Sequence, residues 1–408
     1  MSHHILNRYL KFIIRRIHVM KKIAIIIQAL RGGGAERTAA NMSIDLSSAF
    51  EVHLIVFDAD KISFKYGGTL HRLDLPSRKS NYHKIMTFFK RLYAVRKIKK
   101  EIGFDCCISL MEGANLVNIL TKQRERIVVS ERNLISFFVK KRIHKALVKY
   151  IHKKADVVVS LSEFVRRDLI RNFNDNPQKV VTIYNSVDIS KFNLTDSDEI
   201  VNHPYIVTMG RLTYQKAQWH IIKAFSKLTL KYPQLKLAIL GEGELRSQLE
   251  LLVKNLKISD KVLFLGYQKR PHLIIKNAEF FVFSSVVEGL GSVLLEALAC
   301  GKAIISTDCD AGPREILAPS TDIEKKTSSI EHGDYGVLVP VDLNNEFSPS
   351  NIQLTEKEMI MSSAIDELMR DLDLRGDYER KSAIRVEDFS PAKISKDWID
   401  LIFGLING

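Results

Sequence analysis

The stretch SSVVEGLGSVLLEALACGKAIISTDCDAGPREIL, residues 284–317, tells most about the fold of this chain. An apolar run typical of a buried strand precedes it, Gly289 and Gly291 can turn the chain sharply, and a helix is expected to begin near Ser292. The start of such a helix points free backbone N–H groups and a positive dipole end at an anion. The stretch therefore predicts a strand, a glycine turn and a helix that together suit a diphosphate.

Two glutamates, Glu288 and Glu296, lie eight residues apart around this turn. On one ideal helix that spacing separates them by ~12 Å, which exceeds the roughly 5–9.5 Å between the paired carboxylates of glycosidases. We therefore interpret them as two separate hydrogen-bond acceptors, each able to hold the hydroxyls of a sugar. The alternative is that both are solvated residues of an amphipathic helix, as most glutamates are.

Further short motifs follow one another along the chain. They are GGGAER at residues 32–37, IYNSVD at 183–188, GRL at 210–212 with Gln215 and Lys216, LGEG at 240–243, LGY at 265–267, the two-glutamate stretch and YGVLVP at 335–340. In this order the motifs resemble those of the retaining glycosyltransferases of family 4, over about residues 21–405. The resemblance implies an α/β protein with the GT-B fold, in which two doubly wound Rossmann-like domains face a central cleft.

The alternation of apolar runs and amphipathic segments independently indicates parallel sheets covered by helices. The expected strands are residues 23–27, 52–57, 106–110, 127–130, 157–161 and 180–183 in the first half, and 206–209, 235–240, 262–264, 280–283, 303–306 and 337–339 in the second. Residues 318–334 are expected to form a loop. The expected domains are an N-terminal extension at 1–20, an acceptor-binding domain at 21–190, a nucleotide-sugar-binding domain at 200–390 and, from the resemblance, a helix at 391–408 that crosses back to the first domain.

Arg211 and Lys216 follow the expected strand 206–209, at the carboxyl end where open α/β sheets bind ligands. Both cations can neutralise the diphosphate of a nucleotide-sugar donor as it leaves. The resemblance assigns them this catalytic role together with Glu288, although exposed surface cations are the plain alternative. The expected donor-binding residues are Gly33, Gly34, Gly210, Gly241, Gly289, Leu290, Gly291, Ser292 and Glu296.

The three glycines at 32–34 do not match a dinucleotide fingerprint, and no Walker lysine follows them. They allow backbone N–H groups to approach a phosphate or a sugar closely. They can also form a plain flexible turn between a strand and a helix. The resemblance favours the first interpretation.

Ser130, Glu131, Arg132 and Asn133 lie where many family members carry a histidine, which this chain lacks at these positions. The role of that histidine therefore cannot be transferred to one residue here. All four residues, together with Glu112 after the preceding strand, are candidates for contact with the acceptor. Alternatively, they are structural turn residues.

Asp308 and Asp310 resemble the D-x-D metal motif of other glycosyltransferases, and two carboxylates do suit Mg²⁺ or Mn²⁺. They belong, however, to the second half of the chain, beside GPRE at 312–315. The resemblance implies that cationic side chains and helix dipoles take the place of a metal. We therefore expect an enzyme without a metal or another cofactor.

Positive charge is concentrated in the first half of the chain. Residues 1–190 contain 35 Lys and Arg against 16 Asp and Glu, whereas residues 191–408 contain 26 against 31. Two basic, helix-like stretches with interleaved apolar residues, 72–100 and 122–154, suggest binding to an anionic membrane surface. Solvated helix faces are the alternative. Nucleic acid is not an expected partner, because the sequence contains no nucleic-acid-binding motif.

Residues 1–20 have the pattern of a basic amphipathic helix, although translation starting at Met20 would leave them out. No apolar run reaches the ~18 residues of a membrane span. The four cysteines have no metal-site spacing, which suits a reducing cytoplasm. These features predict a cytoplasmic protein bound peripherally to the cytoplasmic face of the inner membrane.

Together, the resemblance and the charge predict a retaining transferase. It would move a hexose or N-acetylhexosamine, of the galactose, GalNAc or GlcNAc type, from a UDP-sugar to a lipid-linked glycan, such as one on polyprenyl diphosphate. One alternative is a soluble glycosyltransferase with a non-lipid acceptor. Another is a UDP-sugar epimerase of the same fold.

Overall fold

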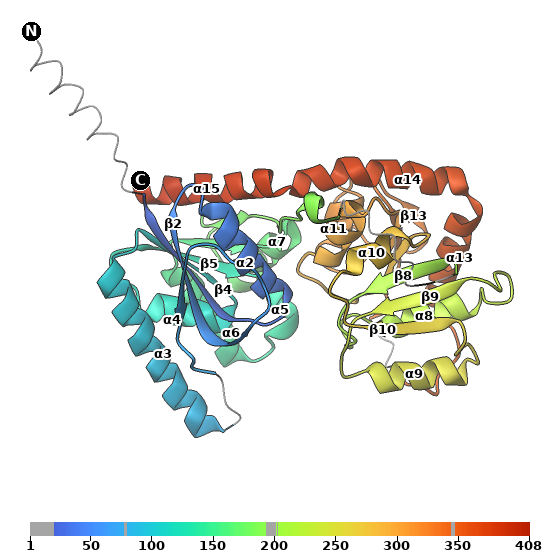
Figure 1. Ribbon diagram of the computed structural model, residues 1–408, viewed down its shortest axis with the longest axis horizontal. Coiled ribbons are helices and arrows are strands. Elements are labelled where there is room, and N and C mark those ends of the chain that lie inside the picture. The colour runs from blue at the N-terminus through green and yellow to red at the C-terminus, as the bar shows by residue number, and fades with distance from the viewer. Residues whose placement is uncertain (1–19, 77–79, 193–200, 202, 344–346) are drawn as a thin grey trace, which may run out of the picture. The chain divides into compact units, whose positions relative to one another are not determined.

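The computed structural model describes residues 20–76, 80–192, 201, 203–343 and 347–408 (Figure 1). The chain divides into two compact units. The first contains the described residues up to Ser130, together with Lys154–Val157 and Trp398–Gly408. The second contains Glu131–Lys153 and Val158–Asp397. None of the described helices is long and apolar enough to span a membrane.

The first sheet has seven strands, in the order β3-β2-β1-β4-β5-β6-β7. The strands are β1 (Lys22–Leu30), β2 (Glu51–Ile62), β3 (Thr69–Arg72), β4 (Cys106–Leu110), β5 (Arg126–Glu131), β6 (Val157–Ser160) and β7 (Val180–Thr182). The central strands are runs of Ile, Val and Leu buried on both faces, as in a sheet covered by helices on both sides. Strand order reverses between β1 and β4, so the loops after these two strands flank a topological switch point.

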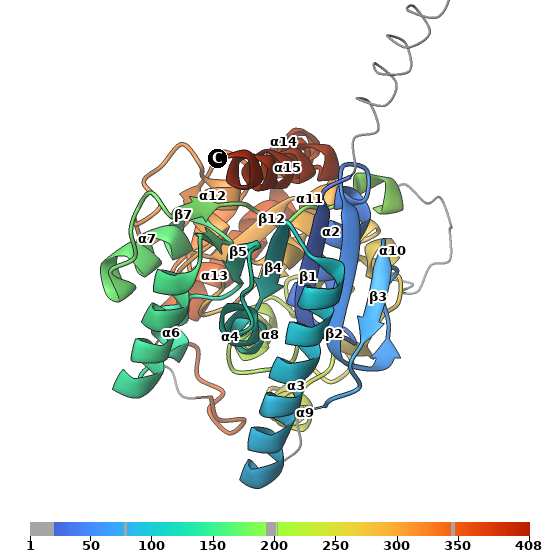
Figure 2. The same ribbon diagram turned by 90° about the vertical axis from the view of Figure 1, so that its left-hand side faces the viewer.

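Helices connect most strands of this sheet, whereas β2 leads to β3 with no helix between them. They are α2 (Gly34–Leu46), α3 (Asn81–Ile102), α4 (Glu112–Leu120), α5 (Ile135–Phe138), α6 (Arg142–Lys154) and α7 (Glu163–Phe173). Helix α3 is the longest of them and lies along one face of the first sheet, with its first turns beyond the ends of the strands (Figure 2). The second sequence stretch expected to be helix-like, residues 122–154, is not one helix, because β5, α5 and α6 divide it.

The second sheet also has seven strands, in the order β10-β9-β8-β11-β12-β14-β13. They are β8 (Tyr205–Met209), β9 (Lys236–Leu240), β10 (Val262–Gly266), β11 (Phe281–Phe283), β12 (Ile304–Thr307), β13 (Glu331–His332) and β14 (Val337–Val339). Every recorded pair is parallel except β13 with β14. The strand order reverses between β8 and β11, which places the loops that carry Lys216 and Glu288 at a second switch point.

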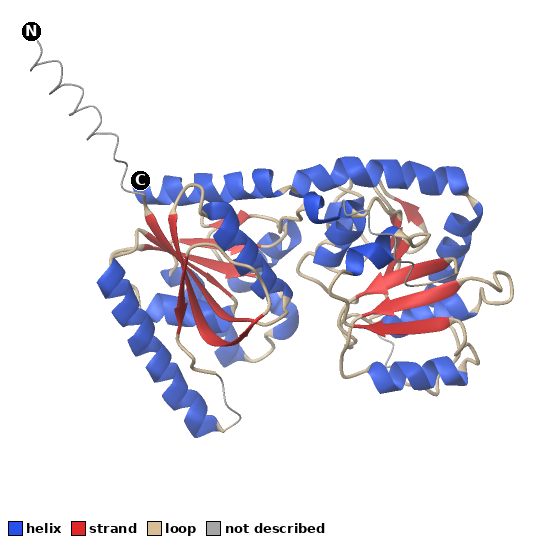
Figure 3. Ribbon diagram, in the orientation of Figure 1, coloured by secondary structure: helices blue, strands red, loops and turns tan. Residues whose placement is uncertain are grey.

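Helices cover the second sheet as they cover the first (Figure 3). They are α8 (Gln218–Ser226), α9 (Arg246–Asn255), α10 (Pro271–Lys276), α11 (Ser292–Ala299), α12 (Pro313–Leu317), α13 (Glu356–Arg370) and α14 (Leu372–Arg385), with 3-10 turns η1 (Ile189–Phe192) and η2 (Val386–Phe389). The last helix, α15 (Pro391–Asn407), belongs to the first unit from Trp398 onward. The core between strands and helices includes Phe281, Phe283, Leu294 and Ile304. Within the first unit, Phe403 of α15 packs on Phe50, with ring centroids 4.8 Å apart.

The prediction of two parallel-sheet, Rossmann-like α/β domains is confirmed. The loop expected at residues 318–334 is wrong at its end, where β13 forms, and β3 was not predicted. Both are short edge strands. The expected domain boundaries stay predictions, and the helix expected at residues 1–20 lies outside the described residues but for Met20.

Candidate active site

Two loops meet at the switch point of the second sheet, one after β8 and one after β11. The backbone N–H of Val286 donates to the carbonyl of Gln215 over 2.9 Å, and Gln215 Nε2 donates to the carbonyl of Val287 over 2.9 Å. Ser284 Oγ donates to the carbonyl of Lys216 over 2.8 Å. These three hydrogen bonds fix the loop that carries Lys216 against the loop that carries Glu288.

The side chains of Lys216 and Glu288 form an ion pair with a hydrogen bond from Nζ to Oε1. Both side chains are largely shielded from solvent, the glutamate more than the lysine. Lys216 Nζ also lies 5.5 Å from the centre of the Phe283 ring, a distance at which a cation is attracted to an aromatic face. The ammonium group of Lys216 is therefore held in place at the carboxyl ends of the strands, where open α/β sheets bind ligands and where it could contact an anionic group. Arg211, the other predicted cation, is exposed on the same loop.

Glycines let the neighbouring loops pack backbone against backbone. Gly241 has φ +129°, and a Cβ on it would lie 2.0 Å from the carbonyl oxygen of Gly210. A Cβ on Gly243 would lie 2.2 Å from the carbonyl oxygen of Leu212. The predicted donor residue Gly241 is thus required by the close approach of the loops after β8 and β9, whatever it contacts in a ligand. A Cβ on Gly210, in contrast, would meet only side-chain atoms, the nearest being those of Lys216 at 3.4 Å.

The turn at residues 289–292 leads into α11, which begins at Ser292 as predicted. Gly291 has φ +81° and precedes the helix directly. Leu290 is buried, and a Cβ on Gly312 would lie 1.8 Å from its carbonyl oxygen. Glu296 is partly exposed in the second turn of the helix. The turn is therefore held from both sides, with the N–H groups of the first turn of α11 at its end.

Glu131 does not lie free beside this turn. Its Oε1 is 3.1 Å from Nε2 of His152, and Nδ1 of His152 is 2.6 Å from Oδ2 of Asp175. Burial acts to lower the pKa of His152, but the hydrogen bonds to Asp175 and Glu131 outweigh it and raise the pKa to about 9. The imidazolium therefore donates to both carboxylates, and Glu131 is held in a buried pair. The sequence did not single out His152, which lies in α6, 21 residues after Glu131.

Arg132 and Asn133 follow Glu131 and contact the turn at residues 289–292. Arg132 is buried, and burial lowers its pKa to about 10 against the opposing effect of Glu131. Its guanidinium donates to Oδ1 of Asn185. This acceptor-candidate segment therefore lies beside predicted donor residues within the second unit.

In the first unit, the glycine loop is closed by a residue that the sequence did not single out. Oε2 of Glu36 accepts hydrogen bonds from the backbone N–H groups of Arg31, Gly32 and Gly33, over 2.5, 2.9 and 3.2 Å. The signal for this contact is a glutamate in the first turn of the helix after the loop. An anion at these N–H groups would have to displace Glu36. The ligand roles of Gly33 and Gly34 stay predictions.

Two further acceptor candidates, Glu112 and Ser130, lie at the carboxyl ends of β4 and β5 in the first sheet. Glu112 begins α4 directly after β4. Ser130 is buried near the end of β5, and its carbonyl accepts from the N–H of Met111 over 3.3 Å. The structure thus brings these two residues together at adjacent strand ends. Their contact with an acceptor stays a prediction.

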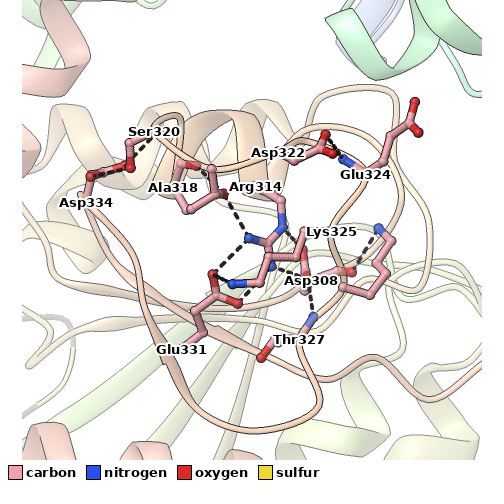
Figure 4. A network of polar contacts seen from close by, with 12 residues as sticks. Asp308, Arg314, Ala318, Ser320, Asp322, Glu324, Lys325, Thr327, Glu331 and Asp334 are labelled. Carbon is pink, nitrogen blue, oxygen red and sulfur yellow. Dashed lines mark hydrogen bonds and ion pairs between the residues drawn. The ribbon is translucent and has the colours of Figure 1, made fainter.

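The aspartates of the D-x-D sequence are engaged by cations of the protein. Arg314 donates to Asp308 from Nε over 3.1 Å and from Nη2 over 2.6 Å, and to Glu331 over 2.9 and 3.0 Å (Figure 4). Asp310 pairs with Lys326 over 2.8 Å. Within the described part of the chain, no three His, Cys, Asp or Glu side chains form a group that could hold a metal ion. Independence from metal stays a prediction.

Two parallel sheets with charged loops at their switch points define a GT-B protein of two Rossmann-like domains. Residues 32–191 match the family described as Glycosyltransferase Family 4, and residues 191–332 match the family described as Glycosyl transferases group 1. The chain belongs to the family 4 glycosyltransferases.

Relatives with assigned reactions support this membership. The chain is 30% identical to the N-acetylgalactosamine-N,N'-diacetylbacillosaminyl-diphospho-undecaprenol 4-alpha-N-acetylgalactosaminyltransferase of Campylobacter jejuni, over 94% of this chain and 100% of that protein. It is 26% identical to a second Campylobacter jejuni protein, the GalNAc-alpha-(1->4)-GalNAc-alpha-(1->3)-diNAcBac-PP-undecaprenol alpha-1,4-N-acetyl-D-galactosaminyltransferase. This alignment covers 94% of this chain and 98% of that protein.

Solved structures resemble it in fold. Anabaena Alr3699/HepE in complex with UDP and glucose aligns with a TM-score of 0.74 and 16% identity, over 94% of this chain and 100% of that one. At this identity the similarity shows the fold alone. The predicted family and fold are both confirmed.

Proposed function

We propose that this glycosyltransferase moves an N-acetylhexosamine or hexose from a UDP-sugar to a glycan carried on polyprenyl diphosphate, with retention of configuration. The observation that carries the proposal is the Lys216–Glu288 pair beside the start of α11, at the switch point of the second sheet. The Campylobacter relatives, whose names specify undecaprenol-linked acceptors, favour a lipid-linked glycan. The UDP in the Anabaena protein favours uridine as the nucleotide.

In the proposed reaction, the acceptor hydroxyl oxygen forms a bond to the anomeric carbon on the face from which UDP departs. The bond from the anomeric carbon to the phosphate oxygen breaks, and UDP takes the electron pair. The hydroxyl proton passes to the leaving phosphate. Lys216, Arg211 and the first N–H groups of α11 would stabilise the charge that develops on that phosphate.

The proposal is tested by UDP release from UDP-GalNAc, UDP-GlcNAc, UDP-galactose and UDP-glucose. Each donor is supplied with and without a polyprenyl-diphosphate-linked glycan. We expect release that needs both one donor and the lipid-linked acceptor. Equal release with a free oligosaccharide would instead show a soluble acceptor. Interconversion of UDP-sugars without an acceptor would show an epimerase, and no release from any donor would contradict the assignment of uridine.

We further propose that the enzyme docks on an anionic membrane, at the cytoplasmic face of the inner membrane, through α3. Between residues 82 and 93 this helix exposes Tyr82, Ile85, Met86, Phe89 and Tyr93. Phe89 is 60% exposed and Tyr93 is 75% exposed. Positions 82, 86, 89 and 93 share one helical face. Aromatic side chains on one face of a helix suit insertion at a lipid headgroup boundary.

Cations accompany this apolar face of α3. The exposed ones are Lys84, Lys90, Arg96, Lys97 and Lys100. The exposed acidic residue of the helix, Glu101, lies 3.8 Å from Lys97 and so is already paired. The positive charge of α3 therefore complements anionic lipid headgroups, whereas a neutral surface would not attract these cations.

Replacing Phe89 and Tyr93 together by serine should weaken binding to phosphatidylglycerol-containing vesicles by at least about tenfold. The reason is that the variant lacks two large apolar side chains whose transfer from water into the membrane would favour binding. Cosedimentation with vesicles of increasing phosphatidylglycerol content measures the change. Leu230→Ser is the matched control, since Leu230 is 95% exposed and lies outside α3. If wild type and the double variant sediment equally, α3 is not the docking surface.

A further inference from the structure

The segment after β5 supports the turn at residues 289–292 in two ways. All the residues concerned belong to the second unit. First, the backbones touch: a Cβ on Gly289 would lie 2.5 Å from the carbonyl oxygen of Arg132 and 3.2 Å from Cα of Asn133. Any side chain at position 289 would push these two segments apart.

Second, a chain of side-chain hydrogen bonds joins Arg132 to the first residue of α11. The guanidinium of Arg132 donates to Oδ1 of Asn185, and Nδ2 of Asn185 donates to Oγ of Ser292 over 2.7 Å. Arg132 and Asn185 are buried, and Ser292 is partly exposed. The chain therefore leads from the protein interior to the predicted donor site.

The chemistry of these groups fixes the direction of every hydrogen bond. A guanidinium can only donate, so the atom of Asn185 that faces Arg132 must be the amide oxygen. The amide nitrogen then faces Ser292, which must accept with Oγ. A serine hydroxyl that accepts here still has its own proton to donate elsewhere. Among the described residues, no side chain or carbonyl is recorded as taking that proton.

We propose that Arg132, acting through Asn185, sets Ser292 as a hydrogen-bond donor to a phosphate oxygen of the nucleotide-sugar. Arg132 and Asn185 are then positioning residues of the donor side, although the sequence suggested Arg132 for the acceptor side. The proposal rests on the function proposed above. It also accounts for an arginine at position 132. A side chain that can both donate and accept would allow the amide of Asn185 to flip and exchange the positions of its oxygen and nitrogen.

The sharpest substitution is Asn185→Asp, which keeps the shape of the side chain. A carboxylate accepts from both neighbours, so the hydroxyl of Ser292 would turn to donate inward and lose its proton for the phosphate. We expect UDP to bind about three- to tenfold more weakly to this variant, and to Ser292→Ala, which loses the same hydrogen bond. The double variant should lose no more than the single variants, since both remove one interaction.

The experiment is titration calorimetry with UDP alone, followed by KM for donor and acceptor. Arg132→Met should match Ser292→Ala, and Arg132→Lys, which can still only donate, should retain more affinity. Donor KM should rise and acceptor KM should stay unchanged, a division that general loss of structure would not produce. Ser190→Ala is the control, because it removes an exposed serine hydroxyl that bonds to Asp188. Thermal melting checks that each variant is folded.

Several results would overturn the inference. Unchanged UDP affinity in Ser292→Ala, additive losses in the double variant, or a rise in acceptor KM alone would each do so. If wild type binds UDP and all the variants bind it equally well, this inference is wrong, but the proposed donor stands. If wild type itself does not bind UDP, the proposed donor fails, and this inference fails with it.

Discussion

Replacing Lys216 by methionine is expected to lower kcat by about 10²–10³-fold, the usual cost of removing one preplaced donor from a site where charge develops. Lys216 is held by its ion pair with Glu288 and lies against the ring of Phe283. Its loop is also fixed by hydrogen bonds to residues 284–287. In the proposed reaction, the cation therefore needs no reorganisation when the phosphate leaves. Methionine keeps much of the apolar stem and removes the charge.

Steady-state kinetics of Lys216→Met with the preferred donor measure this effect, and thermal melting separates it from unfolding. Lys227→Met, a change at an exposed lysine just after α8, is the matched control and should keep nearly full activity. Glu288→Gln tests the pair from the other side, since glutamine keeps the shape but loses the charge that holds Lys216. Activity of Lys216→Met within about twofold of wild type, with an unchanged melting temperature, would remove Lys216 from the catalytic machinery.

The strands that form the centre of each sheet were predictable because burial on both faces demands uninterrupted apolar runs. Residues 23–27, 106–110 and 337–339 are such runs, and each lies within an observed strand. The strands β3 and β13 carry no such signal. They are edge strands with polar, partly exposed residues, and only pairing with a neighbour makes them strands. Which segments pair with each other depends on the tertiary structure, and the pattern of residues within a short segment does not predict it.

The candidate site divides in the same way. Glycine turns and the start of α11 were predictable, because backbone geometry restricts which residues can occupy them. The partners of the charged groups were not. Lys216 and Glu288 are 72 residues apart in sequence, and Arg132 and Asn185 are 53 apart. Asn185 lay in a motif that indicated the family, but its hydrogen bonds to Arg132 and Ser292 in the folded chain are what suggest its role.

Replacing Arg314 by methionine is expected to destabilise the protein by about 3–5 kcal/mol, the range for removing one partner of a buried ion pair. Its guanidinium lies between Asp308, which is also buried, and Glu331 (Figure 4). Without the cation, the backbone N–H of Thr327, at 2.8 Å, would be the one donor to the Asp308 carboxylate that remains among the described residues. Chemical denaturation measures the loss. Arg380→Met, at an exposed arginine paired three residues away along α14, should change the midpoint little.

The pH dependence of this loss identifies its cause. Hydrogen bonds from Arg314 lower the pKa of Glu331 to about 2, against an ordinary value of 4.5. A carboxylate with a lowered pKa contributes stability that is present above about pH 4.5 and disappears as the pH falls through about 2. The difference in unfolding free energy between wild type and Arg314→Met should therefore shrink over this range. In addition, Asp308→Leu combined with Arg314→Met should be less harmful than Arg314→Met alone, because no buried charge then lacks its partner. A difference that is independent of pH and additive with Asp308→Leu would show that Arg314 stabilises the fold by packing, with no contribution from its charge.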